Sequence, residues 1–302
     1  MKKRILALGL TVALAAASLA ACGGASTKTT EKQTEAGTEK SSEKATEAAK
    51  EEKADSGELR TYKLGVNGSD HEEWEKANEL LQKDNIKLEM VEFSDYVKPN
   101  EALEDGEIDL NAFQTEIYFN NFVKERGYTD LGVLAYTQVA PMGIYSSKYK
   151  SLDEATGHLI IAIPNDVTNG GRALKFLEKN GFLTLKKEAG LTPTVMDIEK
   201  YNKDVEIVEM VATQIPASLP DLSFACINNG VAKDAGLTLK NDAIVYEDYK
   251  EPDMKNYWNI IAAKKDRIES EDFQKIKKAY NSDEVKQVIL EHYDGQSIPV
   301  WD

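Results

Sequence analysis

VEFSDYVKPNEALEDGEIDLNAFQTEIYFNNF, residues 91–122, is the stretch of sequence that decides the fold. Its spacing of apolar and turn-forming residues predicts a strand, a helix and a second strand, at 86–93, 99–105 and 108–112. Tyr96 follows the first of these strands and Phe113 follows the second. In open α/β sheets, ligands bind beyond the carboxyl ends of the strands. The stretch therefore predicts an α/β fold and one wall of a ligand pocket.

The aromatic residues beyond the first strand divide into two groups. Phe119 and Phe122 are interpreted as core residues, since large aromatic side chains are usually buried. Tyr96, Phe113 and Tyr118 each have polar neighbours in the sequence. We expect these three to form the pocket wall.

Strands and helices alternate through the rest of the folded part, which is typical of mostly parallel sheets flanked by helices. Further strands are predicted at 62–66, 131–139, 142–145, 159–163, 205–210, 223–227, 243–246 and 258–263. Further helices are predicted at 71–83, 114–126, 170–180, 213–219, 229–235, 270–280 and 282–292. The last section has no obvious sheet of its own, so we expect it to complete the first lobe. The prediction is two α/β lobes joined by two crossover strands with a ligand cleft between them: lobe 1 at 58–148 plus 250–302, and lobe 2 at 149–249.

The first 57 residues predict export and anchoring. The basic start MKKR precedes the apolar run Ile5–Ala17, and small residues follow it up to Leu-Ala-Ala-Cys, which ends at Cys22. This pattern predicts a signal peptide over 1–21. The last four residues resemble the bacterial lipobox, whose Cys is lipidated, for instance with palmitate; the alternative is an ordinary signal peptide with a chance Cys. Residues 22–57 lack aromatics and are predicted to be a disordered, lipid-anchored tether.

Acidic residues outnumber basic ones 52 to 37 in the 302-residue chain, a formal net charge of -15. This balance argues against charge-driven binding of nucleic acid or an anionic membrane surface, since both attract Lys and Arg. Three scattered histidines give no metal-ligand spacing, and two cysteines exclude a disulfide framework. The nucleotide-binding, zinc-protease and serine-hydrolase motifs are absent. We expect no cofactor, no metal and no catalytic residue.

The loop NDVTNGGRAL, residues 165–174, predicts the second wall of the pocket. Asn169 is interpreted as the N-cap of the helix that follows. Two glycines in its first turn indicate close approach to the backbone, since each costs about 1 kcal/mol relative to Ala. Arg172 lies where the positive end of a helix disfavours a cation. A bound carboxylate would account for both features; the alternative is that Arg172 pairs with a nearby acid such as Asp166.

Two further segments bring amides to the same cleft. Asn228 and Asn229 follow the buried strand 223–227, and an amide offers both a donor and an acceptor to a zwitterion. A helix cap is the alternative for Asn229. Asn259 lies at the start of a later strand, and Cys226 is expected to be an inert buried thiol.

Five ordered segments, VEFSDYVKPNEAL, LNAFQ, PMGIYS, IAIPNDVTNGGRAL and NIIAAKK, resemble the methionine-binding lipoproteins of ABC importers (MetQ/NlpA type). The resemblance covers nearly all of Tyr62 to Asp302. It implies a two-lobed, type II periplasmic-binding-protein fold and delivery of methionine to a membrane permease driven by an ATPase. It also implies a ligand site in which rings enclose the thioether and polar groups hold the amino and carboxylate groups. The rings are Tyr96, Phe113 and Tyr118; the polar groups are Asn169, Arg172, Asn228 and Asn259.

One residue departs from the family pattern. The family usually reads Asn-Ala-Phe-Gln-His, with the His in the pocket, where this chain has Thr115. Thr is smaller and cannot place an imidazole against the ligand. Methionine, as the L- or D-enantiomer, is the favoured ligand. The alternatives are another amino acid, such as a bulkier relative, and a methionyl dipeptide.

Two other classes of protein compete with this receptor. An enzyme on the same architecture would need a perturbed acid–base group in the cleft. Its candidates are Asp95, Asp166 and Glu116, none of which has a His near it in the sequence. A surface adhesin with a vestigial pocket is also compatible with the sequence. The favoured hypothesis is a monomeric, non-enzymatic receptor, anchored by lipid at the extracytoplasmic face of the cell membrane.

Overall fold

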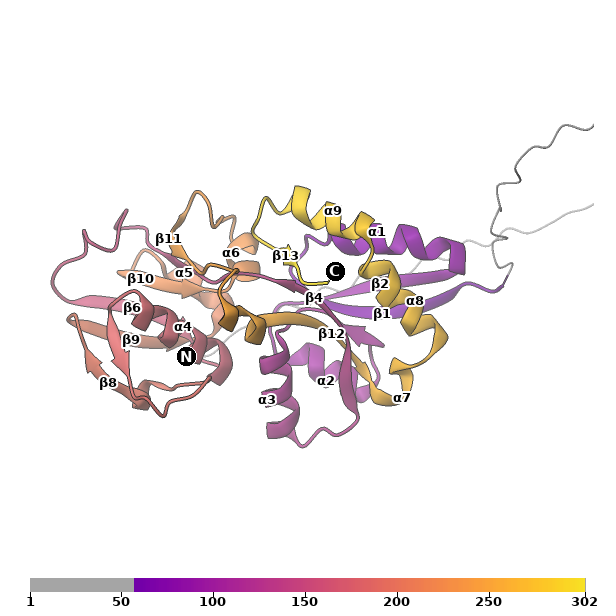
Figure 1. The fold of residues 1–302 in the computed structure, drawn as a ribbon, viewed down its shortest axis with the longest axis horizontal. Helices are drawn as coiled ribbons and strands as arrows, with labels where there is room; N and C mark the ends of the chain where they lie inside the picture. The colour runs from indigo at the N-terminus through magenta and orange to yellow at the C-terminus, as the bar shows by residue number, and fades with distance from the viewer. Residues whose placement is uncertain (1–56, 302) are drawn as a thin grey trace, which may run out of the picture. The chain divides into compact units, whose positions relative to one another are not determined.

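The computed structural model describes residues 57–301 (Figure 1). The predicted signal peptide, the predicted lipidation site Cys22 and almost all of the predicted tether lie outside the described residues. Among residues 57–301, no helix has the length and apolar character needed to span a bilayer.

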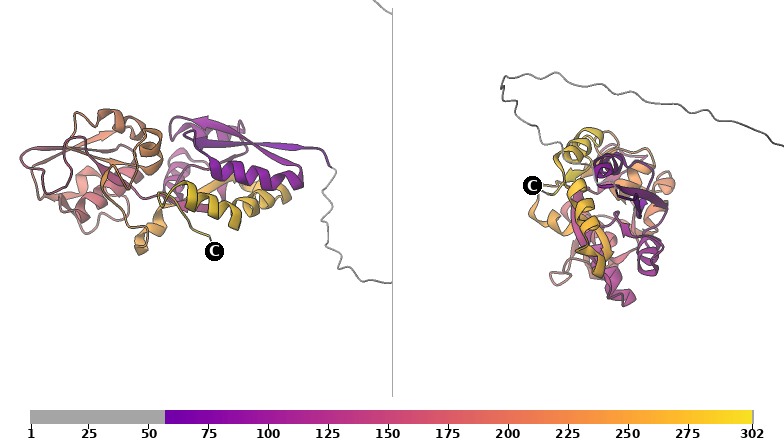
Figure 2. Two further views of the ribbon diagram at one scale, coloured as in Figure 1. Left: turned by 90° about the horizontal axis from the view of Figure 1, so that it is seen from above. Right: turned by 90° about the vertical axis from the view of Figure 1, so that its right-hand side faces the viewer.

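The first sheet has six strands in the order β13-β4-β12-β3-β1-β2. They are β1 (Arg60–Asn67), β2 (Ile86–Phe93), β3 (Leu110–Asn111), β4 (Leu131–Val139), β12 (Trp258–Lys264) and β13 (Ile298–Pro299). One face packs on α1 (Glu72–Leu81), α8 (Glu271–Tyr280) and α9 (Asp283–His292). The other face packs on α2 (Lys98–Asp105) and α3 (Glu116–Arg126). We call this sheet with its helices lobe 1. Figure 2 shows its C-terminal helices, in yellow, beside the indigo α1.

The second sheet has five strands in the order β11-β5-β10-β6-β9. They are β5 (Gly143–Tyr145), β6 (Leu159–Pro164), β9 (Val205–Met210), β10 (Phe224–Ile227) and β11 (Ala243–Tyr246). Helix α4 (Val167–Lys179) packs in one core cluster, and α5 (Ile215–Ser218) and α6 (Asn229–Asp234) pack in another. We call this sheet with its helices lobe 2. The two-stranded sheet of β7 (Leu183–Leu185) and β8 (Ile198–Tyr201) is separate.

The short helical segments of one or two turns connect these elements. They are η1 (Gln82–Asp84), η2 (Val195–Asp197), η3 (Ala212–Gln214), η4 (Pro252–Tyr257) and α7 (Lys265–Ile268).

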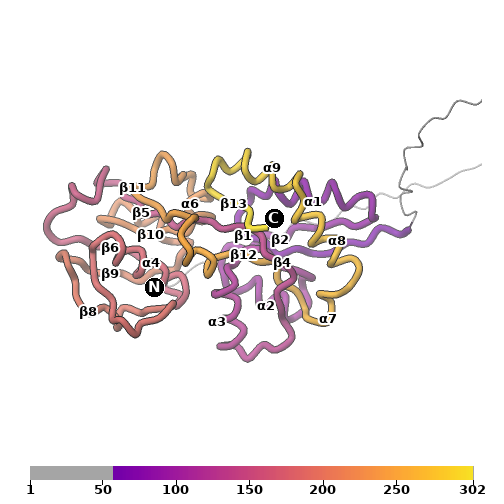
Figure 3. Tube along the Cα trace, viewed as in Figure 1, coloured from indigo at the N-terminus to yellow at the C-terminus, as the bar shows by residue number. Residues whose placement is uncertain are grey.

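Two chain segments connect the sheets, as predicted, and can be followed in Figure 3. β4 of the first sheet leads directly to β5 of the second, and β11 of the second leads through η4 to β12 of the first. Both β5 and β12 pair antiparallel with their neighbours. The prediction of mostly parallel sheets is therefore wrong at β5 and β12. A strand that arrives from the other lobe enters its new sheet at the carboxyl ends of the parallel strands, so it must run in the opposite direction.

The crossing to the second sheet comes early in the chain. β5 pairs with β10 and β11, although it lies ahead of residue 149, where lobe 2 is predicted to begin. The section from β12 onward joins the first sheet through β3 and β4. The exact lobe boundaries stay a prediction, and the pairing of β5 favours a start of lobe 2 before Gly143.

Local sequence signals explain the helix ends. Ser270 and Ser282 cap α8 and α9, because each side chain accepts a hydrogen bond from a backbone N–H in the first turn. Gly106 and Gly127 end α2 and α3 in the left-handed conformation that glycine adopts without strain.

Candidate ligand-binding site

One cavity of about 630 Å³ is lined by residues of both lobes. It receives the loops after β1, β2 and β3 from lobe 1, and the starts of α4 and α6 from lobe 2. All eight residues predicted to bind ligand line it: Tyr96, Phe113, Thr115, Tyr118, Asn169, Arg172, Asn228 and Asn259. The fold therefore brings these eight residues together around one cavity. Their contact with a ligand stays a prediction.

The three predicted rings form one aromatic cluster. The ring centroids of Tyr96, Phe113 and Tyr118 lie 5.9, 6.1 and 6.2 Å apart, and the Tyr118 hydroxyl donates to the backbone oxygen of Tyr96 at 2.9 Å. Burial raises the pKa of both phenols, so both remain protonated donors. Phe119 and Phe122 are buried as predicted. The cluster gives the cavity an apolar wall with little conformational freedom.

A buried network of amides holds the segment that carries Phe113 and Thr115. Asn100, Asn111 and Gln114 exchange hydrogen bonds of 2.7–2.9 Å and are at most 3% exposed. The Thr115 hydroxyl caps α3 by accepting from a backbone N–H at 3.3 Å. Because the network is fully buried and mutually bonded, it fixes the backbone from which these two side chains project.

The helix after the loop at 165–174 begins earlier than predicted. Asp166, and not Asn169, is the N-cap of α4, since its carboxylate accepts from the Asn169 backbone N–H at 2.8 Å. The N-cap prediction for Asn169 is therefore wrong. The Asn169 side chain instead donates to Asp166 and accepts from the Asn228 amide at 2.8 Å. This pair of amides joins the start of α4 to the start of α6 at the cavity.

Arg172 is buried and already paired. Its Nε lies 3.0 Å from Glu247 Oε1, its Nη2 donates to Glu247 and to the Ala140 backbone oxygen, and its guanidinium carbon lies 4.3 Å from the Tyr257 ring centroid. The alternative prediction, that Arg172 pairs with an acidic residue, is thus correct, but that residue is Glu247 and not Asp166. Within residues 57–301, Nη1 forms no hydrogen bond. That nitrogen is the part of the guanidinium that remains for a ligand.

The glycines of α4 also have an explanation within the chain. A Cβ at Gly170 would lie 2.7 Å from the Pro164 oxygen, and one at Gly171 would lie 2.8 Å from the Thr192 Cα. The close approach that the sequence indicates is therefore made by the protein's own backbone. The two features that predicted a bound anion are both accounted for without one.

Several buried oxygens at the cavity have no partner within the described part of the chain. They are Oδ1 of Asn67, Asn228 and Asn229 and Oε1 of Gln138, all from residues that line the cavity. Buried polar atoms in folded proteins are nearly always hydrogen-bonded. Each of these side chains lines the cavity, but the oxygen atoms themselves are shielded from it, so a ligand donor such as an ammonium group reaches them only after the side chains rotate.

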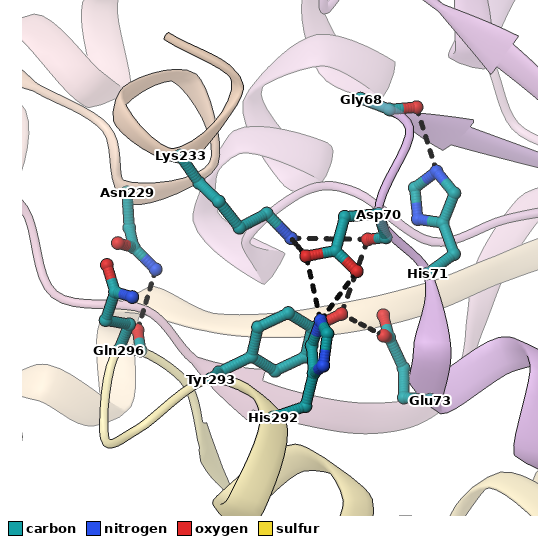
Figure 4. Close-up of polar contacts among 9 residues, drawn as sticks. All are labelled: Gly68, Asp70, His71, Glu73, Asn229, Lys233, His292, Tyr293 and Gln296. Carbon is teal, nitrogen blue, oxygen red and sulfur yellow. Dashed lines mark hydrogen bonds and ion pairs between the residues drawn. The ribbon is translucent and has the colours of Figure 1, made fainter. Parts of the chain in front are cut away.

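A charged cluster forms another part of the cavity lining (Figure 4). Asp70, in the loop between β1 and α1, contacts His292 and Lys233. Burial alone would raise the pKa of Asp70, but the hydrogen bond from His292 and the charge of Lys233 outweigh it and lower that pKa. Glu73 is 5% exposed and accepts a hydrogen bond from the Tyr293 hydroxyl. Burial raises the pKa of Glu73, although Tyr293 and Lys233 oppose the shift.

Glu73→Gln is expected to stabilise the protein at neutral pH. A carboxyl whose pKa is raised by folding contributes stability that is complete below its unfolded pKa, near 4.5, and is lost as pH rises through the folded pKa. Gln keeps an oxygen for Tyr293 without the buried charge. The melting temperature should exceed that of the wild type at pH 7, by about 2–4 °C per kcal/mol gained, and match it near pH 4.

Glu72→Gln is the matched control for this variant. Glu72 lies in the same first turn of α1 but is exposed, so both variants lose the same interaction with the helix dipole. Circular dichroism melts at the two pH values make the comparison. A Glu73→Gln melting temperature at pH 7 no higher than that of Glu72→Gln would contradict the buried-charge argument.

The three acids considered for catalysis have structural roles. Asp95 accepts from two backbone N–H groups, Asp166 caps α4, and Glu116 accepts from the Tyr136 hydroxyl. No pairing of these acids with a His occurs in residues 57–301. Over the same residues, no group of three or more His, Cys, Asp or Glu is arranged to hold a metal ion. Cys226 is buried, and burial raises the pKa of its thiol.

Sequence reasoning missed several residues at the site. Glu247 neutralises Arg172, Lys233 joins the lobes, and Gln138 and Asn67 bring unpartnered oxygens. Asn67 is the last residue of β1 and Gln138 is the last but one of β4, and both strands end at the cavity. Their place at the ends of strands could have identified them from the sequence as site residues. Glu247 and Lys233 lie in segments that look, in sequence, like ordinary exposed charged segments. No local pattern therefore identified them as site residues.

Comparison with known proteins places these observations in a family. The sequence profile described as NlpA lipoprotein matches residues 62–301. The chain is 40% identical over 243 residues to the D-methionine-binding lipoprotein MetQ of Escherichia coli (strain K12), covering 79% of this chain and 88% of the relative.

Solved structures agree with this match. A nutrient binding protein from Burkholderia cenocepacia bound to methionine is 36% identical, with a TM-score of 0.75, over 80% of this chain and 100% of that one. The substrate binding protein of a methionine transporter from Streptococcus pneumoniae is 38% identical, also with a TM-score of 0.75, over 80% of this chain and 96% of that one. Both similarities extend over both lobes.

Proposed function

This chain belongs to the NlpA lipoprotein family, and on that premise we propose that it is the substrate-binding lipoprotein of an ABC importer. It captures methionine, as the L-enantiomer, the D-enantiomer or both, between its lobes and delivers it to the permease and ATPase subunits. Lipid on Cys22 anchors it at the extracytoplasmic face of the cell membrane. The relatives named for methionine support the ligand class.

The observation that carries the proposal is the meeting of an aromatic wall and a polar cluster in one cavity. A thioether packs well against aromatic rings, and the rings of Tyr96, Phe113 and Tyr118 offer that surface. The polar side of the ligand would meet Nη1 of Arg172 and the amide pair of Asn169 and Asn228. An amino acid with a long apolar side chain matches both halves of the cavity.

Pairing with Glu247 changes how Arg172 contributes to binding. The guanidinium and the carboxylate cancel in net charge, so Arg172 offers a directed hydrogen bond and little long-range attraction. The side-chain amides of Asn228 and Asn229 line the cavity, and on rotation their unpartnered oxygens supply acceptors for the ligand ammonium. Recognition by directed groups suits a zwitterion, whose own net charge is zero.

Calorimetry of residues 58–302 against L- and D-methionine tests the proposal. We expect saturable heat with one or both enantiomers, since every described residue that lines the cavity lies within this range. A panel of other amino acids and a methionyl dipeptide resolves the side-chain preference that Thr115 leaves open. Absence of heat with both enantiomers would remove methionine from the account, and turnover of an amino-acid derivative would favour an enzyme instead.

A further inference from the structure

The loop between β1 and α1 is contacted by both lobes (Figure 4). From lobe 1, His292 Nε2 lies 2.8 Å from the Asp70 carboxylate, and the Tyr293 hydroxyl donates to the Asp70 backbone oxygen at 3.3 Å. From lobe 2, Lys233 Nζ donates to the same backbone oxygen at 3.2 Å and lies 3.5 Å from Asp70 Oδ2. Asp70 is therefore a point at which α6 of lobe 2 is joined to lobe 1.

The surroundings of Lys233 make this contact stronger than an ordinary surface ion pair. Its ammonium lies 4.4 Å from the Tyr293 ring centroid, which attracts a cation through its face. The side chains of Lys233 and Asp70 are 27% and 38% exposed. Partial burial strengthens the attraction between the charges, yet enough solvent remains for salt to screen it.

Neighbouring contacts show that α6 lies directly against the loop. A Cβ at Gly68 would lie 2.5 Å from an oxygen of the Asp234 carboxylate, which places the α6 side chain against the loop, and the φ of +81° favours glycine at this position. Asn229 donates to the Gln296 backbone oxygen at 2.7 Å. Lys233 is thus a charged member of a larger contact between the lobes.

We propose that Lys233 is a positioning residue for ligand retention: by pairing with Asp70 across the cavity, it holds the two lobes together and slows release of a bound ligand. The inference rests on the proposed receptor function. Lobes that bend about a hinge must separate for the ligand to leave, and this pair must break when they do. Its loss therefore acts on the dissociation rate more than on the association rate.

The test uses the full-length chain in detergent, loaded with L- or D-methionine and followed by stopped-flow fluorescence. Lys233→Met keeps the length of the side chain and removes its charge, and its dissociation rate constant is expected to rise about tenfold. Lys233→Arg should restore the rate to within about threefold. Raising NaCl should speed dissociation from the wild type and the Arg variant, and leave the Met variant unchanged, because screening acts only where the pair exists.

Lys240→Met is the matched control. Lys240 of lobe 2 also pairs with lobe 1, through Asp294 at 3.1 Å, but the two side chains are 69% and 72% exposed. Such an exposed pair contributes little, so the dissociation rate should stay within about twofold of the wild type. Equal rates in Lys233→Met and Lys240→Met, or the same salt response in Lys233→Met as in the wild type, would overturn the proposal.

Hydrogen exchange without ligand separates this inference from the receptor function. Lys233→Met should speed exchange at the amides of Trp74 and Glu75, which donate to the His71 backbone oxygen at 2.9 and 3.0 Å, because the loop loses its contact with α6. If the wild type binds neither enantiomer, the receptor proposal fails on its own, and faster exchange still supports the contact between the lobes. Unchanged exchange in the variant overturns the role of Lys233 whatever the ligand.

Discussion

Arg172→Ala is expected to lower the free energy of unfolding by about 3–5 kcal/mol, because it leaves the Glu247 carboxylate buried without its partner. Glu247 is 8% exposed, and its other contact is the Met142 backbone N–H at 2.7 Å. The same substitution removes Nη1 from the cavity, so ligand affinity should fall by well over tenfold. Urea denaturation measures the first effect and calorimetry the second.

The double variant Arg172→Ala with Glu247→Gln separates the two effects. Gln keeps the hydrogen bond to Met142 and removes the unpaired charge, so most of the lost stability should return. Affinity should not return, since no donor replaces Nη1. Recovery of binding in the double variant would mean that the guanidinium acts only by neutralising Glu247 and does not contact the ligand.

Gly171→Ala is expected to destabilise lobe 2 by about 1–3 kcal/mol, because the added methyl overpacks a rigid contact. Its Cβ would lie 2.8 Å from the Thr192 Cα and 3.0 Å from the Pro193 oxygen, both backbone atoms that move only with the chain. The midpoint of urea denaturation should fall.

Gly230→Ala serves as the control for this effect. Gly230 lies in α6, and nothing stands within 4 Å of the position its Cβ would take. Ala there should stabilise the helix by up to about 1 kcal/mol through its lower backbone entropy in the unfolded chain. A higher midpoint in both variants would show that helix propensity, and not the contact at Thr192, decides the outcome.

The pocket wall was predictable because it depends on local order in the chain. Tyr96 and Phe113 follow strands, and the carboxyl ends of parallel strands meet at one edge of a sheet. The strands 86–93, 131–139, 205–210 and 243–246 were predicted with the bounds of β2, β4, β9 and β11. Each of these strands is recognisable in the sequence because apolar and polar residues alternate in it or because it is a continuous apolar run bounded by turn residues. β7, β8 and β13 were missed. β8 has no buried residue, and β13 is two residues long and ends in Pro299, so neither has the apolar pattern of a strand.

Pairings between distant residues were not predictable. Arg172 and Glu247 are 75 residues apart in sequence, and nothing near Glu247 distinguishes it from an exposed acid at the end of a strand. Asn169 was mistaken for a cap because both Asp166 and Asn169 favour that position, and only the backbone shows which one lies outside the helix. Glu73 follows Glu72 in a first helical turn that is rich in acidic residues. The sequence therefore does not show that Glu73, unlike Glu72, is buried beside Tyr293.

The position of β12 in the first sheet has a consequence for how the chain acquires its structure. β12 occupies the middle of that sheet, between β3 and β4, yet its residues are made only after all five strands of the second sheet. The five strands of the second sheet all come from one continuous segment of the chain, from β5 to β11. Each of them therefore has its neighbouring strands available once Tyr246 has been synthesised. During synthesis, the lobe made first is therefore expected to mature last, with β3 and β4 unpaired on their facing edges until the final 45 residues arrive.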